Sequence, residues 1–393
     1  MLINRILMPH LLELAKSFPA IAIMGPRQSG KTTLAKQAFP HYAYVTLEDL
    51  DMRMAAQEDP RSFFDTYAKK DGLIIDEIQE VPELLSYMQG IIDQAHKPGR
   101  FIITGSQHFL MYEKITQTLA GRIALLTLLP LSVDELKEAN LLPDTIEPLL
   151  IKGFYPRLYS QIMPVQIWYA NYISTYVEKD VRQILNISDV VKFQKFIKLC
   201  AARVGNLINY ADLARDCGIT PHTAKDWISV LEASFIIKIV TPYHNNFSKR
   251  LVKSPKLYFY DTALICALLG IKTEEDLLIH PFKGAIFESF VMSELFKHSF
   301  NKAELPNLYF WRDTQGKEID CIIEKAFGVT IPIEIKARKT IVENFFETGS
   351  QWKSISNQPT TSTYIIYSGN ETVHRKTGTA ISWKNISEFI DSL

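Results

Sequence analysis

The chain has 393 residues, of which 47% are hydrophobic and 22% charged, so it is long enough for two or three domains with well-filled cores. Its 43 basic residues equal its 43 acidic residues, which excludes a general electrostatic attraction to nucleic acid or a membrane. The spacing of the four cysteines argues against a zinc knuckle or a disulfide framework; they are Cys200, Cys217, Cys266 and Cys321.

The N-terminal segment up to Lys16 is predicted to form an amphipathic helix that packs on the first sheet. It lacks a signal-peptide cleavage pattern. No apolar run in the chain approaches the roughly 18 to 20 residues of a membrane span. We therefore expect a cytoplasmic protein without a membrane partner.

The strongest motif follows the first predicted strand. Residues 19–24 are a short apolar run typical of a buried parallel strand, and residues 33–39 favour a helix. The loop between them fits G-x-x-x-x-G-K-[ST] in full, which predicts that its amide groups and the following helix bind the phosphates of ATP. Lys31 is expected to reach the β and γ phosphates, and Thr32 to bind Mg²⁺. The predicted nucleotide-binding residues are Gly25, Pro26, Arg27, Gln28, Ser29, Gly30, Lys31, Thr32 and Thr33.

A second nucleotide motif lies at residues 72–82, after another predicted strand at 42–47. Its apolar run ends in two carboxylates. Asp76 is expected to act through Mg²⁺, and Glu77 to polarise a water molecule as a general base. The sequence therefore predicts hydrolysis of the nucleotide as well as binding.

Two further strands are predicted at residues 100–107 and 123–130. Ser106, with Gln107 as second choice, is placed to sense the γ-phosphate or to orient water, because open α/β sheets bind ligands outside the carboxyl ends of their strands. The alternative is a simple turn. Arg122 stands where an arginine could reach a triphosphate in its own subunit or, in a homo-oligomer, in a neighbour. A solvated arginine before a strand is the alternative.

The middle of the chain begins with helical segments, including a long helix from about 164 to 177 whose aromatic stripe favours core packing over base stacking. Residues 210–217 and 221–233 then predict two short helices, with Gly218 ending the first and Thr220 capping the second. Predicted strands at 235–240 and 256–260 complete a winged-helix pattern.

In a DNA-binding winged helix, Thr223, Lys225 and basic residues of the loop between the strands would contact DNA. Those loop residues are Lys249, Arg250 and Lys253. Asp226 and Glu232 on the second helix weaken this interpretation. The alternative is a module that only packs between two other domains.

The last third predicts a helix at 282–300 that carries Glu288, followed by strands at 308–311, 318–323 and 331–336 with turns at 315–316 and 327–328. A closing strand at 364–367 and a helix within 381–393 end the chain.

Strand alternation places Glu334 and Lys336 on one face, and pairing with the strand of Asp320 would bring the charges together. With Glu288, these carboxylates could hold Mg²⁺ or Mn²⁺ for phosphodiester cleavage. The alternative is a sheet with outward-facing charges.

These motifs resemble those of a widespread family of prokaryotic AAA+-like P-loop ATPases with a C-terminal domain of unknown function. The N-terminal motifs G-P-R-Q-x-G-K-T-T, D-E-[IV]-Q and T-G-S are matched within 25–33, 75–79 and 104–106. The C-terminal motifs G-[KR]-E-[IV]-D and P-I-E-[IV]-K are matched at 316–320 and 332–336.

The C-terminal motifs are similar to those of PD-(D/E)XK (restriction-endonuclease-like) nucleases. This resemblance implies catalytic roles for Asp320, Glu334 and Lys336. Cys321, where the family often has Phe, is a small departure.

The sequence thus predicts an α/β protein. It comprises a P-loop ATPase domain with a parallel sheet at 1–132, a helical linker or lid at 133–195, a winged-helix-like module at 196–262, and an α/β restriction-endonuclease-like domain at 263–393. The leading hypothesis is that ATP binding and hydrolysis control how the last two modules act on DNA or a protein partner. The alternatives are an ATP-regulated, metal-dependent nuclease and a non-catalytic interaction protein with an ATP switch.

Overall fold

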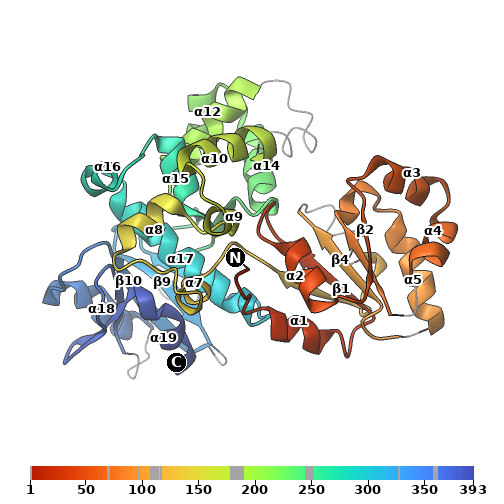
Figure 1. The fold of residues 1–393 in the computed structure, drawn as a ribbon. Coiled ribbons are helices and arrows are strands. Elements are labelled where there is room, and N and C mark those ends of the chain that lie inside the picture. Colours follow the sequence, from red (N-terminus) through yellow and green to blue (C-terminus); the bar gives the residue numbers. More distant parts are fainter. Residues whose placement is uncertain are drawn as a thin grey trace.

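The computed structural model describes residues 2–68, 71–95, 97–106, 115, 117–177, 190–243, 252–325, 328–356 and 362–393. Figure 1 shows an N-terminal α/β domain beside a larger body in which central helices pack against a C-terminal sheet. In the described part of the chain, no helix is both long and apolar enough to cross a membrane.

The N-terminal sheet is parallel throughout. Its strands are, in spatial order, β2 (Ala43–Thr46), β3 (Leu73–Asp76), β4 (Phe101–Gly105), β1 (Ala20–Met24) and β5 (Ile123–Thr127). The three inner strands are buried along their whole length, which explains their uninterrupted apolar runs. The predicted parallel sheet is therefore confirmed.

Helices cover both faces of this sheet. Alternate residues of β1 point to opposite faces, so Ile21 packs with α1 (Met8–Leu14) and α2 (Lys31–Ala38), whereas Ala22 faces the other layer. That layer contains α4 (Pro60–Tyr67) and α5 (Leu84–Ala95); α3 (Leu50–Glu58) and a 3₁₀ turn η1 (Ile78–Glu80) complete the domain. Helix α1 is shorter than the sequence pattern suggests, and Leu12 of its predicted apolar stripe is exposed. The predicted helix around 109–119 lies largely outside the described residues.

The central region is mainly helical. Its helices are α7 (Val133–Glu138), α8 (Ile146–Lys152), α9 (Arg157–Ser160), α10 (Val165–Tyr172), α12 (Val190–Ala201), α13 (Tyr210–Cys217), α14 (Pro221–Ala233), α15 (Thr262–Leu269) and α16 (Glu274–Ile279). The two strands β6 (Ile237–Val240) and β7 (Lys256–Phe259) pair antiparallel. The predicted caps are present: Gly218 has φ +66° after α13, and the Thr220 side chain accepts from the Thr223 amide. The sequence did not predict α15 and α16.

The long helix predicted over 164–177 is regular only to Tyr172, after which one π-helical turn η2 (Ile173–Val177) follows. The hydroxyls of Ser174 and Thr175 both donate to the Asn171 carbonyl, at 3.2 and 2.6 Å. Hydroxyls bonded in this way compete with the backbone amides of the α-helix for its carbonyl oxygens. Trp168 and Tyr172 are buried, so the aromatic stripe packs in the core as the sequence favoured.

The C-terminal sheet has the order β12 (Val373–Arg375), β13 (Gly378–Ser382), β11 (Tyr364–Tyr367), β10 (Thr330–Lys336), β9 (Glu318–Glu324), β8 (Leu308–Arg312). The pairs β8–β9 and β9–β10 are antiparallel, as predicted, whereas β10–β11 and β11–β13 are parallel. Parallel neighbours need a crossover, which η4 (Glu343–Phe346) and α18 (Glu347–Ser356) supply between β10 and β11. The turn η5 (Trp383–Asn385) and α19 (Ile386–Ser392) close the chain. Phe327 of the predicted turn lies outside the described residues.

Helix α17 (Lys283–Asn301) lies between the central helices and this sheet (Figure 1). Its apolar residues share one continuous core with the central helices and the C-terminal strands. The regions after β5 are therefore packed as a single body rather than as separate globules.

Candidate functional site

The phosphate loop folds around the side chain of its own lysine. Gly25 lies so close to the residue after β5 that a Cβ there would be 2.1 Å from the Leu128 carbonyl oxygen. Gly30 has φ +98°, which favours glycine, immediately before α2. Lys31 is 4% exposed, and its Nζ donates to the carbonyls of Gly25 at 3.0 Å and Pro26 at 2.9 Å. The ammonium is thus held across the mouth of the loop.

Asp76 at the end of β3 lies directly opposite this loop. Its carboxylate accepts from the Thr32 hydroxyl at 2.9 Å, from the Tyr44 hydroxyl at 2.8 Å and from Thr104. Burial and the charge of Asp76 raise the pKa of Tyr44 above its ordinary value, so the phenol stays a donor. Asp76 is 6% exposed and forms no ion pair with a basic side chain in the described part of the chain. Hydroxyl and carboxylate oxygens without a local cation are the ligands that Mg²⁺ prefers.

Glu77 follows in a left-handed backbone conformation, with φ +55°. Residues other than glycine adopt this conformation at a cost that the surrounding structure must offset, often at functional sites. The carboxylate accepts from the Ser106 hydroxyl at 2.9 Å and from the Gln79 amide. Burial alone would raise the pKa of Glu77, but the charge of Lys31 and the Gln79 hydrogen bond outweigh it and hold the pKa below its ordinary value. Glu77 is therefore ionised.

The strand order explains why Ser106 reaches Glu77. Because β4 lies between β1 and β3, the residue after β4 stands between the phosphate loop and the two carboxylates. Sequence reasoning placed Ser106 at this edge, and the structure brings it into contact with Glu77. Gln107, the second choice, lies outside the described residues.

The loop and Glu77 line one pocket of about 450 Å³. Pro156, directly before α9, and Arg157 and Ser160 of α9 also line this pocket. Arg157 was not identified from the sequence, because a single arginine after Tyr155 and Pro156 belongs to no motif. Only the packing of α9 against the phosphate loop brings it here.

A neighbouring hollow of about 350 Å³ shares Gln28 and Arg157 with the phosphate pocket. The segment that leads into α10 and α10 itself give it apolar walls at Met163, Ile167 and Trp168, and the polar Asn171 and Thr175 also line it. The two hollows together offer a charged part and an apolar part, which suits a nucleotide.

The prediction that Arg122 reaches the triphosphate of its own subunit is wrong. Strand β5 runs parallel to β1, so the residue before β5 lies at the amino edge of the sheet, where the Ala20 amide donates to the Arg122 carbonyl at 3.2 Å. The phosphate loop is at the opposite, carboxyl edge. The Arg122 side chain instead pairs with Asp93, at 2.6 Å. Its action on a neighbouring subunit stays a prediction.

The structure brings together the charges predicted on β9 and β10. Lys336 Nζ lies 2.7 Å from Glu334 Oε2 and 3.5 Å from Asp320 Oδ2, and Asp320 also accepts from the Ile335 amide at 2.7 Å. Burial and the charge of Asp320 raise the pKa of Glu334. The alternative prediction, a sheet with outward-facing charges, does not describe these three residues.

Glu288 on α17 lies at the edge of this cluster, but its nearest partners come from β7. Glu288 Oε1 accepts from Lys256 Nζ at 2.9 Å and from the Tyr258 hydroxyl at 2.6 Å. One oxygen of each of Glu288, Glu318 and Asp320 lies within 4.8 Å of the others. Sequence reasoning missed Glu318, although alternation along β9 puts it on the same face as Asp320.

The surface of α14 is less basic than a DNA-binding helix requires. Lys225 is exposed, but the neighbouring His222 pairs with Asp226 at 2.8 Å, and Glu232 is bound by Lys238 at 2.6 Å. Of the predicted loop cations, Lys253 is exposed, while Lys249 and Arg250 lie outside the described residues.

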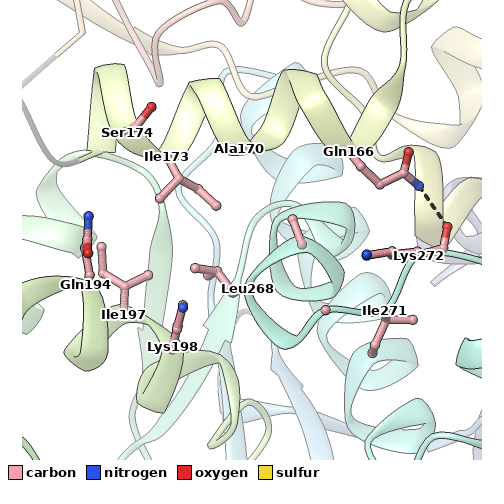
Figure 2. A pocket seen from close by; sticks show the side chains of 12 residues that line it. Gln166, Ala170, Ile173, Ser174, Gln194, Ile197, Lys198, Leu268, Ile271 and Lys272 are labelled. Carbon is pink, nitrogen blue, oxygen red and sulfur yellow. Dashed lines mark hydrogen bonds between the residues drawn. The ribbon is translucent and has the colours of Figure 1, made fainter. Parts of the chain in front are cut away.

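A further pocket of about 440 Å³ lies between α10, α12 and α15 (Figure 2). Its walls carry the apolar side chains of Ile173, Ile197 and Leu268, and Gln166 closes one side by donating to the Lys272 carbonyl at 2.8 Å. It contains none of the site residues predicted from the sequence.

Family models match three consecutive parts of the chain. An AAA domain matches residues 17–137, a domain of unknown function (DUF8612) matches 143–275, and another (DUF4143) matches 283–386. With the parallel sheet and the phosphate loop, the first match defines the N-terminal part as an AAA-type P-loop ATPase domain. This supports ATP binding and hydrolysis.

The chain as a whole belongs to the family of two uncharacterized mycobacterial proteins, Rv2008c of Mycobacterium tuberculosis (strain ATCC 25618 / H37Rv) and Mb2031c of Mycobacterium bovis (strain ATCC BAA-935 / AF2122/97). It is 30% identical to each over 331 residues, which are 82% of this chain and 71% of the relative.

Three solved structures are similar at low scores. The Walker-type ATPase PABY2304 of Pyrococcus abyssi is 15% identical with a TM-score of 0.44, covering 67% of this chain and 94% of its own. AMPPCP-bound DnaA from Aquifex aeolicus is 17% identical with a TM-score of 0.30, covering 56% and 84%. The Thermotoga maritima RuvB Holliday junction branch migration motor is 20% identical with a TM-score of 0.30, covering 61% and 90%.

Proposed function

We propose that the protein binds ATP with Mg²⁺ in the pocket of the phosphate loop and hydrolyses it. The observation that carries this proposal is that Lys31 and an ionised Glu77, from separate motifs, line the same pocket. The amides of the loop from Gly25 to Gly30 and the start of α2 bind the phosphates, and Lys31 neutralises the β and γ phosphates.

Thr32 and Asp76 are the residues that would hold Mg²⁺, since their oxygens already face each other at 2.9 Å. When bound, the ion neutralises charge on the phosphate oxygens. Glu77 takes a proton from the attacking water, and Ser106 with Gln79 keeps its carboxylate aimed at the pocket. Arg157 stabilises charge in the same pocket, and the hollow beside α10 receives the base.

The substitution Glu77→Gln is expected to leave ATP bound while lowering its hydrolysis by about 100-fold or more, the typical contribution of a general base. The amide keeps the size of the side chain but cannot take a proton. Phosphate release measures the rate, and isothermal titration with ATP and Mg²⁺ measures the affinity. Glu83→Gln, a substitution of the same kind just before α5, is the matched control. Equal hydrolysis by the wild type and Glu77→Gln would remove Glu77 from the mechanism.

We further propose that the nucleotide state changes the arrangement of the C-terminal body on a DNA or protein partner. A chain of buried polar contacts joins the two. Arg5 donates to the Ser29 carbonyl in the phosphate loop at 2.7 Å and pairs with Glu135 of α7 at 2.9 Å. Within the same segment the Val133 amide donates to Glu294 of α17 at 2.8 Å. A shift of the loop on hydrolysis thus has a contiguous route to α17.

The helix–turn–helix and the β6–β7 ribbon favour a winged-helix module as the partner-binding part. The acidic partners around α14 favour a protein partner over DNA at that surface. Association of the protein with itself, which would bring Arg122 to a neighbour's site, belongs to the same proposal.

A second candidate function is metal-dependent cleavage of DNA or RNA by a PD-(D/E)XK-like C-terminal domain. The convergence of Asp320, Glu334 and Lys336 on neighbouring antiparallel strands favours it. The same convergence speaks against a sheet with outward-facing charges, the arrangement that would favour a non-catalytic interaction protein.

If this domain is a nuclease, the full chain with Mg²⁺ or Mn²⁺ is expected to cut at least one of single-stranded DNA, double-stranded DNA or RNA, with or without ATP. Lys336→Ala should then lower the rate by about 100-fold or more, as loss of an electrostatic stabiliser does. Intact substrates under all these conditions would count heavily against cleavage. They would leave the ATPase proposal untouched, because that is measured by phosphate release.

A further inference from the structure

The carboxylate cluster between α17 and β9 already contains a cation. Lys256, at the start of β7, is 1% exposed, and its Nζ lies 2.9 Å from Glu288 Oε1 and pairs with Glu318. Two carboxylates of the cluster, Glu288 and Glu318, thus contact the ammonium group directly. Lys256 is therefore a fixed positive charge among the three carboxylates.

The same cluster has the character of a divalent-cation site. Three carboxylate oxygens from Glu288, Glu318 and Asp320 lie within 4.8 Å of one another, and oxygen ligands suit Mg²⁺ and Mn²⁺. An independent sign is Glu334, which is 4% exposed and whose Oε1 has no hydrogen-bond partner among the described residues. A buried carboxylate oxygen without a donor is costly, and a metal ion beside Asp320 would satisfy it.

We infer that Lys256 takes the place of a divalent cation and closes the cluster of Glu288, Glu318 and Asp320 to Mg²⁺ and Mn²⁺. The lysine comes from the β6–β7 ribbon, outside the sheet that carries Asp320, Glu334 and Lys336. The central region thus holds the C-terminal cluster in a metal-free form. This inference goes beyond the proposed function. It shares Asp320 with the second candidate function, and if it holds, the chain with Lys256 in place binds no metal there and does not cleave nucleic acid by a metal-dependent step.

The position of Lys256 is secured by the contacts that follow it along β7. The Tyr258 hydroxyl donates to Glu288 at 2.6 Å. The Phe259 amide donates to the Ser289 hydroxyl at 2.9 Å, and that hydroxyl donates to the Phe259 carbonyl at 3.0 Å. The Ser293 hydroxyl then donates to the Tyr260 carbonyl at 2.7 Å. These bonds hold the backbone of the ribbon against α17 and so keep Lys256 next to the cluster.

The test is a titration of the full chain with Mn²⁺, followed by the electron paramagnetic resonance signal of the free ion. All proteins carry Asp76→Asn and are free of nucleotide, which removes the proposed metal ligand of the ATP site. Lys256→Met is expected to gain one bound Mn²⁺ per chain, with affinity at least about tenfold above that of the Lys256 protein. Asp320→Asn in addition to Lys256→Met should abolish the gain.

Lys297→Met is the matched control, because Lys297 is also 1% exposed and pairs with a carboxylate of α17, Glu294, at 2.7 Å. It should gain no Mn²⁺, since Glu294 is not part of the trio. Mn²⁺ should also raise the thermal midpoint of Lys256→Met but not that of Lys297→Met.

Equal Mn²⁺ binding with and without Lys256 would overturn the inference. If Lys256→Met does not fold, Mn²⁺ titration of the proteins that keep Lys256, with and without Asp320→Asn, still tests the inference. A Mn²⁺ ion that binds while Lys256 is present and is lost on Asp320→Asn would overturn it, whereas no such ion supports it. Neither result depends on ATP hydrolysis or on nucleic-acid cleavage, so failure of those proposals is seen separately.

Discussion

Lys31→Ala is expected to lower the affinity for ATP by roughly 30- to 4,000-fold, the range that corresponds to losing one partner of a buried charge pair at about 2 to 5 kcal/mol. The physical reason is that Lys31 is buried and its ammonium is held between the Gly25 and Pro26 carbonyls at the mouth of the loop. Its removal leaves the β and γ phosphates without this charge. Isothermal titration with ATP and Mg²⁺ measures the affinity, and phosphate release should fall to the background rate.

The control is Lys16→Ala, which removes the same charge from an exposed lysine that pairs with Glu13 across one turn. Exposed pairs of this kind contribute little, so binding and hydrolysis should match the wild type. Equal, background-level phosphate release from the wild type and Lys31→Ala would refute the ATPase proposal.

Arg157→Ala is expected to slow ATP hydrolysis by about 1,000-fold, the lower end of the effect of an arginine that stabilises phosphoryl transfer. Arg157 lines the same phosphate pocket as Lys31, and in the described part of the chain its side chain donates to Gln161 at 3.4 Å but forms no ion pair. It is therefore available to phosphate. Single-turnover phosphate release at saturating ATP measures the effect on the chemical step.

Two comparisons test whether the arginine that stabilises phosphoryl transfer belongs to the same chain as the phosphate loop. Arg157→Lys keeps the charge but loses the planar fork, so it should recover only part of the rate. Arg122→Ala removes the arginine at the other edge of the sheet, where it is paired with Asp93. Should Arg122→Ala stop hydrolysis in a way that depends on protein concentration, while Arg157→Ala does not, the arginine would come from a neighbouring subunit.

Much of the ATPase domain could be predicted from sequence because its motifs are local. The phosphate loop needs only a strand, a turn with glycines and a helix in succession, and β1, the loop and α2 occur where the pattern puts them. The pair Asp76–Glu77 depends only on where a buried strand ends. The same holds for Glu334 and Lys336, which alternation places on one face of β10.

Other features depend on contacts between segments that are distant in sequence, and a local sequence pattern carries no information about such contacts. The sequence did not predict the helices α15, α16 and α18, because their apolar and polar residues do not alternate with a clear helical period. The π-helical turn after Tyr172 coincides with two hydroxyls that share one carbonyl. Arg122 looked suitable in sequence because it lies near a strand, and only the parallel pairing of β5 with β1 shows that this strand begins at the edge of the sheet away from the phosphate loop.

The sequence by itself therefore determined that this chain has a nucleotide-binding domain, where its phosphate loop lies, and which carboxylates end its strands. Tertiary structure alone decided which charges share a site. Arg157 lines the pocket of the phosphate loop although more than 120 residues separate the two in sequence. Arg122 lies at the edge of the sheet away from that loop, and Lys256 lies among Glu288, Glu318 and Asp320. The reason is physical: a motif reports backbone conformation over a few residues, whereas the charge balance of a buried site is fixed by whichever distant side chains the packed core brings to it.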